Sequence, residues 1–131
     1  MEPRVIISMH EGRLPDLPAI TRTDCGAIVD FFGNVRGEEE GTTIPGLQYS
    51  AYRPMAEREM ERIARELLAE FRCCEIHVAH RLGFVPVGEC SIALRIAAAH
   101  RGEAINFLEA FMNRLKHDVP IWKQTSPSPE P

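Results

Sequence analysis

The sequence predicts an α+β domain in which two helices cover one face of a mostly antiparallel sheet. Two observations support this class. Short runs of strand-forming residues alternate with two long stretches of helical spacing, in the order β, β, β, α, β, β, α. The chain has 131 residues, 44% hydrophobic and 26% charged, which suits one globular domain with its own core. Two helices are few for such a sheet, so we expect a homodimer to cover its second face.

Strands are predicted where strand-forming apolar residues cluster or alternate with other residues. The clearest are residues 91–99, where Ile92, Leu94 and Ile96 share one side, and residues 75–82, which alternate in the same way. Shorter or less regular strands are expected at residues 5–7, 25–32, 47–52 and 85–87.

Both helices are predicted from apolar residues spaced three and four apart. The first begins at Pro54, since proline suits a first helical position, and its opposite face is charged and solvated. The second covers residues 102–117 and ends before Pro120, which cannot continue a helix. The apolar stripe expected for it consists of Ile105, Leu108, Phe111, Met112 and Leu115.

The remaining segments are predicted to be connectors. Residues 13–24 carry two prolines and are expected to form a connector with one helical turn. Residues 33–46 contain four glycines and a Glu triplet, which indicates a mobile, solvated loop. Residues 1–124 form a single domain, and the proline-rich residues 125–131 are predicted to be a disordered tail.

Charge and motifs exclude several function classes. The net charge of −4 argues against a general nucleic-acid binder, which needs a basic face. No apolar run is long enough for a membrane span, and the N-terminus does not resemble a secretory signal. The four cysteines lack C-x-x-C spacing, so we expect reduced thiols and a cytoplasmic protein. His77 and His80 should point to opposite faces of their strand, so we expect no metal site.

Three stretches concentrate cationic side chains that suit an anionic substrate. Arg36, in the glycine-rich loop, can grip phosphate or carboxylate with two nitrogens. His100 and Arg101 precede the last helix, where they form either an anion site or a capping turn with a buried His100. Lys116 is placed either for catalysis or for interaction with the helix dipole, and Lys123 is the second lysine of this region.

The balance of basic residues singles out these two lysines. Of the fifteen basic residues, thirteen are Arg, and the only lysines are Lys116 and Lys123. A lineage bias toward arginine explains most of the imbalance, but it does not explain where the lysines remain. Trp122, between them, is expected to be packed, or else to wall a flat ligand.

Over residues 25–124 the chain resembles the catalytic (large) subunit of molybdopterin synthase. Five blocks carry the resemblance, in this order: GAIVDFFGNVRG, YRPMAEREM, HRLGFVPVGE, AAAHRGEAINF and LKHDVPIWKQ. The resemblance implies an α/β-hammerhead fold, a homodimer and a catalytic role for the domain of residues 1–124. It further implies that each protomer binds a small ubiquitin-like sulfur-carrier subunit ending in Gly-Gly, so that the assembly is a heterotetramer.

The resemblance also implies an activity and a set of site residues. Sulfur passes from the carrier's C-terminal thiocarboxylate to cyclic pyranopterin monophosphate, which gives the dithiolene of molybdopterin without a metal or other cofactor. Lys116 matches the family's catalytic lysine, and Lys123 matches a second functional lysine that also contacts substrate. Arg36, His100 and Arg101 match the pocket for the pterin phosphate, part of which is reached across the dimer interface. Gln124 departs from relatives that carry a basic residue there.

Two other interpretations use the same residues. A non-catalytic module that binds an anionic metabolite and regulates a partner would use the arginines but not Lys116. An acylphosphatase-like hydrolase is suggested by GNVRG after a strand, but that fold requires a helix directly after the loop.

Overall fold

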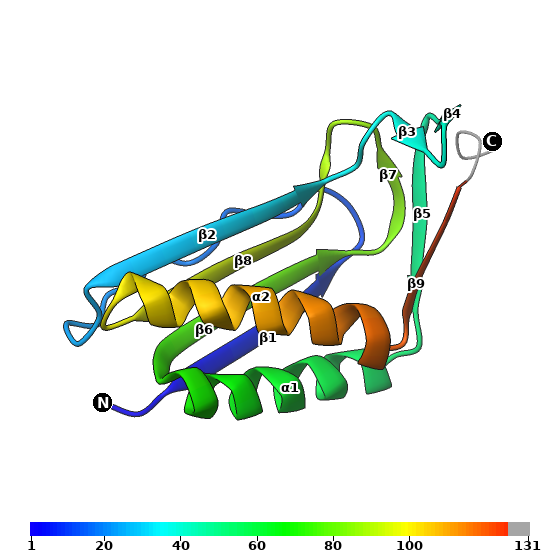
Figure 1. The fold of residues 1–131 in the computed structure, drawn as a ribbon. Coiled ribbons are helices and arrows are strands. Elements are labelled where there is room, and N and C mark those ends of the chain that lie inside the picture. Colours follow the sequence, from blue (N-terminus) through cyan, green and yellow to red (C-terminus); the bar gives the residue numbers. More distant parts are fainter. Residues whose placement is uncertain (126–131) are drawn as a thin grey trace.

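A four-stranded sheet, a three-stranded sheet, a two-stranded hairpin and two helices make up the described part of the chain, residues 1–125 of the computed structural model (Figure 1). The elements are β1 (Arg4–His10), β2 (Ala27–Asn34), β3 (Glu38–Glu39), β4 (Thr42–Thr43), β5 (Gly46–Ala51), α1 (Met55–Phe71), β6 (Cys73–Arg81), β7 (Gly83–Pro86), β8 (Cys90–Ala98), α2 (Arg101–Asp118) and β9 (Ile121–Thr125). Neither helix of this part is long and apolar enough to cross a membrane.

The main sheet has the strand order β1-β6-β8-β2. β8 pairs antiparallel with both β6 and β2, whereas β1 pairs parallel with β6. α1 and α2 lie on one face of this sheet (Figure 1). The expected α+β arrangement of two helices on a mostly antiparallel sheet is therefore confirmed.

The main core lies between this sheet and the helices. Ile76 and Val78 of β6 and Leu94 and Ile96 of β8 point into it, as their alternation predicts. Their helical partners are Met60, Ile63, Leu67, Phe107 and Phe111, among others. Ile105 was expected in the buried stripe of α2, but its side chain is 49% exposed, because Ala104 and Phe107 take the positions against the sheet.

A second sheet, with the order β7-β5-β9, stands at one end of the main sheet (Figure 1). β9 was not predicted. Val119 is extended at the end of α2, and the chain beyond it pairs antiparallel with β5 from Ile121 to Thr125. Thr125, assigned from sequence to the disordered tail, thus belongs to a strand. The rest of that tail lies outside the described residues.

The glycine-rich segment is more ordered than expected. Glu38 and Glu39 pair with Thr42 and Thr43 in a short antiparallel hairpin, β3 and β4. Glu40 and Gly41 make the turn, both with positive φ (51° and 81°), a region that glycine adopts without strain. The hairpin lies beside the second sheet, where Glu39 contacts Lys123 of β9, and most of its residues are exposed to solvent, as expected.

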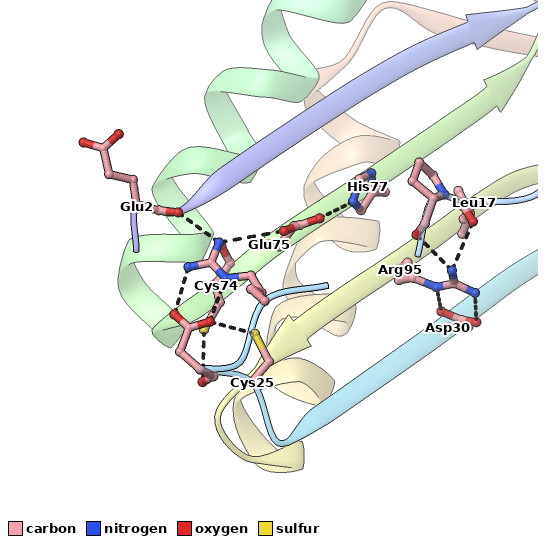
Figure 2. A network of polar contacts seen from close by, with 11 residues as sticks. Glu2, Leu17, Cys25, Asp30, Cys74, Glu75, His77 and Arg95 are labelled. Carbon is pink, nitrogen blue, oxygen red and sulfur yellow. Dashed lines mark hydrogen bonds and ion pairs between the residues drawn. The ribbon is translucent and has the colours of Figure 1, made fainter. Parts of the chain in front are cut away.

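The face of the main sheet away from the helices is partly covered by the N-terminal connector. The Arg95 guanidinium donates to the carbonyls of Leu17 and Pro18 at 3.1 and 3.0 Å, and it pairs with Asp30 at 2.8 Å (Figure 2). The connector forms no helical turn, contrary to the expectation, and runs as irregular chain. Ile28 and Phe32 of β2 remain largely exposed on this face.

Candidate functional site

An open cavity of about 530 Å³ lies where the main sheet meets the second sheet. The last turns of α2 form one wall, and β9 and β5 form another. It is lined by Tyr49, His80, Ser91, Ile92, Met112, Asn113, Leu115, Lys116, Ile121, Trp122 and Lys123. Both lysines of the chain thus meet in one cavity, although Pro120 separates them in sequence.

Lys116 reaches this cavity from the last turn of α2, which ends two residues later at Asp118. A cation there is favoured by the partial negative charge of the helix C-terminus. Within residues 1–125, no carboxylate forms an ion pair with the Lys116 ammonium, whereas Arg114, one half-turn away, pairs with Glu66 and Asp118. The Lys116 amine is therefore available to a ligand.

Lys123 is placed by the pairing of β9 with β5, in which it stands opposite Tyr49. Its Nζ lies 3.5 Å from Oε1 of Glu39 on the hairpin. The neighbouring Trp122 is 57% exposed, so the expectation that it is packed was wrong. Trp122 nevertheless lines the cavity, as the other interpretation, a wall for a flat ligand, requires.

Arg36 approaches the same region through the hairpin. Its Nη2 lies 3.5 Å from Oε2 of Glu39, so one carboxylate stands between Arg36 and Lys123. The Arg36 side chain is otherwise exposed. The structure therefore places Lys116 and Lys123 in one cavity and brings Arg36 near Lys123, on the other side of Glu39.

His100 and Arg101 lie at the opposite end of α2. At 1.5 Å per residue, the fifteen residues from Arg101 to Lys116 span about 22 Å. The His100 N–H donates to Glu103 Oε1 at 3.0 Å in a capping box, and its side chain is 85% exposed rather than buried. In one protomer these two residues are thus separated from the lysine cavity.

The structure adds cavity residues that were not predicted as site residues, above all His80. His80 is 4% exposed, and burial lowers the pKa of its imidazole, because the charged form loses hydration. The Tyr49 ring meets the His80 ring edge-on, with centroids 5.3 Å apart. The available signal was a histidine continuing the apolar stripe of Ile76 and Val78.

A second polar cluster stands at the far end of the sheet (Figure 2). Asp24, Cys25 and Cys74 bring three possible metal ligands within 4.8 Å of one another. Arg22 binds both oxygens of Asp24, at 2.7 and 2.8 Å, and holds the pKa of that carboxyl well below its usual range. Burial raises the pKa of the Cys25 thiol to about 12. A cation there would compete with Arg22 for Asp24 and meet a protonated thiol, so the cluster is a poor metal site.

The opposite orientations predicted for His77 and His80 are confirmed. The His77 Nε2–H donates to Glu75 Oε2 at 2.6 Å, and His77 lines a small cavity under the connector, with Pro15 and Leu17. His80 lies on the helix side of the same strand, in the lysine cavity.

Fold and cavity together define an α+β protein with a lysine-containing site at the junction of two sheets. Within this class, the chain belongs to the MoaE protein family, whose model matches residues 11–118. It is 41% identical over 100 residues to the human molybdopterin synthase catalytic subunit, covering 76% of this chain and 53% of the human protein. A relative of the same name from Thermoplasma volcanium is 34% identical over 105 residues, covering 80% of this chain and 77% of its own.

Solved structures show the same fold. Molybdopterin synthase from Staphylococcus aureus superposes with a TM-score of 0.76 at 29% identity, covering 84% of this chain and 80% of that chain. A complex of subunits 1 and 2 of molybdopterin-converting factor from Helicobacter pylori gives 0.65 at 28% identity, covering 78% and 66%. The chain spans about half the length of the human, bovine and rat relatives that it matches.

Proposed function

We propose that this protein is the catalytic subunit of a molybdopterin synthase, a sulfurtransferase. It takes sulfur from the C-terminal thiocarboxylate of a small ubiquitin-like carrier and transfers it to cyclic pyranopterin monophosphate. The observation that carries the proposal is the convergence of Lys116 and Lys123 in one open cavity of a MoaE-family fold. No metal or other cofactor is required for this transfer.

The lysines have different surroundings and hence different roles. Lys116, which has no carboxylate partner in the described part of the chain, is the group that contacts the carrier's terminal carbonyl. Its ammonium polarises that carbonyl, or its neutral amine attacks it. Lys123 and Arg36 both form ion pairs with the Glu39 carboxylate. When an anionic substrate enters, they exchange these ion pairs for contacts with the substrate.

His100 and Arg101 serve the site of a second protomer. They are about 22 Å from Lys116 along α2, too far for a small pterin held at the lysines. A homodimer resolves this separation, because a partner copy can supply its helix N-terminus to the cavity. The exposed Ile28 and Phe32 on β2 give the sheet an apolar edge region suited to such an interface.

The carrier subunit is the second partner. Its Gly-Gly end has no side chains, so its backbone can approach Lys116 closely in the open cavity. A two-subunit complex is known for the Helicobacter pylori relative, which supports this partner. With a homodimer core and two carriers the assembly is a heterotetramer, and we place it in the cytoplasm.

The direct test is reconstitution. The protein is incubated with thiocarboxylated carrier and cyclic pyranopterin monophosphate, and oxidised molybdopterin is detected by its fluorescence. We expect product with the wild type, and none with Lys116→Ala, which should still bind carrier. Absence of product with partners shown to be active on a known synthase would refute the proposal.

The two other interpretations gain no support. A hydrolase of the acylphosphatase type needs a helix after the GNVRG loop, and the chain forms the hairpin and β5 there instead. A metabolite-binding module has no use for Lys116 in the cavity, where no carboxylate of residues 1–125 pairs with it. It would bind the pterin phosphate in the test above without turning it over.

A further inference from the structure

His80 presents one ring nitrogen to the lysine cavity in a defined protonation form. Its Nδ1 lies 2.9 Å from the carbonyl oxygen of Arg81. A carbonyl only accepts hydrogen bonds, so Nδ1 carries the proton and donates. In the neutral imidazole, the remaining nitrogen, Nε2, therefore holds a lone pair.

The surroundings leave Nε2 to the cavity. Within residues 1–125, no side chain or backbone group forms a hydrogen bond with Nε2. This atom is nevertheless not fully buried. It therefore retains contact with the cavity, which His80 lines. The groups around the ring are Tyr49 from β5, Lys116 from α2, Lys123 from β9, uncharged Ser91 and Ile92 from β8, and Met9 opposite it on β1.

The cavity lining offers few alternatives as a proton acceptor. It contains no Asp or Glu. Its lysines are of a type ordinarily protonated at neutral pH, and tyrosine is ordinarily neutral there and a poor base. Among the described residues that line the cavity, His80 is the one side chain whose class accepts a proton near neutrality.

We propose that His80 Nε2 is the general base that activates water to release the carrier after sulfur transfer, an inference that rests on the proposed function. When the thiocarboxylate sulfur bonds to a carbon of the pterin, an oxygen substituent leaves that carbon with its electron pair, and carrier and pterin are then joined by a thioester. Nε2 takes a proton from water as the water oxygen bonds to the acyl carbon. The acyl carbon–sulfur bond then breaks, and sulfur leaves on the pterin with the electron pair. The imidazolium returns its proton to that sulfur, and the carrier ends as a carboxylic acid.

Burial supports this role. Desolvation lowers the pKa of His80 below its ordinary value of about 6.5, which keeps Nε2 unprotonated at neutral pH. The Arg81 carbonyl opposes this effect, since it favours the charged form, but burial is the larger cause. Carrier release should therefore be slow at acid pH and rise as pH increases through this pKa.

His80→Asn is the discriminating variant. The asparagine amide can keep the hydrogen bond to the Arg81 carbonyl while it removes Nε2. The matched control is His77→Gln, a second buried histidine on β6 that lies outside this cavity. Single-turnover release of carrier carboxylate is followed by mass spectrometry between about pH 4 and pH 8, with carrier affinity and melting temperature measured in parallel.

We expect His80→Asn to slow carrier release by about 10²- to 10⁴-fold, with carrier affinity unchanged. The fall in the release rate toward acid pH, the acid limb of the pH profile, should disappear in this variant. His77→Gln should keep the rate and the limb. A folded His80→Asn with the wild-type rate and limb would overturn the proposal while leaving the synthase function standing. Should the variant not fold, the wild type decides: release that slows as pH falls from about 6.5 to about 4 supports the proposal, and a release rate that stays constant from about pH 4 to pH 8 overturns it. If the wild type forms no product at all, the proposed function fails, and this inference with it.

Discussion

The Lys123 ammonium lies 3.5 Å from Oε1 of Glu39, and this contact links β9 to the β3–β4 hairpin. Oε2 of the same carboxylate is 3.5 Å from Arg36. The Glu39 carboxylate thus lies between Lys123 and Arg36, in the position that we assign to an anionic group of the substrate. Substrate binding would have to displace Glu39 from at least one of them.

Glu39→Gln should therefore strengthen anion binding. Ion pairs this exposed contribute about 0.2–1 kcal/mol, so we expect the Kd for pyranopterin phosphate to fall by about 1.4- to fivefold. Isothermal titration calorimetry at fixed ionic strength measures it. Glu38→Gln is the matched control, because its carboxylate makes no ion pair in residues 1–125. Equal affinities of the two variants would show that Glu39 does not compete with the ligand.

Lys116→Arg should preserve charge and fold but abolish sulfur transfer. Arginine keeps the favourable interaction with the α2 C-terminus, yet its guanidinium does not deprotonate and has a different shape. We expect turnover to fall at least about 100-fold with carrier affinity within about twofold of wild type. Fluorescence of oxidised molybdopterin gives the rate. Turnover near the wild-type level would mean that Lys116 acts only as a surface charge.

Mixed dimers test whether Arg101 serves the partner's cavity. Lys116→Ala and Arg101→Ala dimers should each be inactive, or nearly so. After exchange of subunits, half of the dimers are mixed, and each mixed dimer holds one site with both residues intact, so about a quarter of all sites recover. Activity assays before and after exchange measure this. No recovery despite proven exchange would place Arg101 in the site of its own protomer or in none.

Asp30 should stabilise the protein at neutral pH and cease to do so in acid. Arg95 holds the pKa of Asp30 below its usual value, through hydrogen bonds at 2.8 Å. A lowered folded-state pKa means that the stabilisation is present above about pH 4 and lost as pH falls through the folded pKa. Urea unfolding of wild type and Asp30→Asn should therefore differ at pH 7 and converge toward pH 3.

The control for this pH effect is Glu109→Gln. Glu109 lies exposed on α2 and forms no ion pair within the described residues. Its stability difference from wild type should be small at both pH values. A gap between wild type and Asp30→Asn that persists undiminished at low pH would contradict the assignment of Arg95 as the cause.

Much of the fold was predictable because it depends on neighbours in sequence. Helical spacing located α1 and α2 to within a residue or two, and alternation located β6 and β8 equally well. The β3–β4 hairpin and β9 were missed. Two-residue strands carry no periodicity, and β9 exists only because β5 offers it a partner edge.

The candidate site divides in the same way. By itself the sequence determined which residues carry positive charge, and the rarity of lysine among thirteen arginines drew attention to Lys116 and Lys123. Only the tertiary structure decided that these two share a cavity, that Arg36 approaches through Glu39, and that His100 and Arg101 stand apart. It also turned His80 from a strand residue into part of the cavity wall. The reason is physical: periodicity acts over a few residues, whereas a cavity is set by the register of strands far apart in the chain, here β5 against β9.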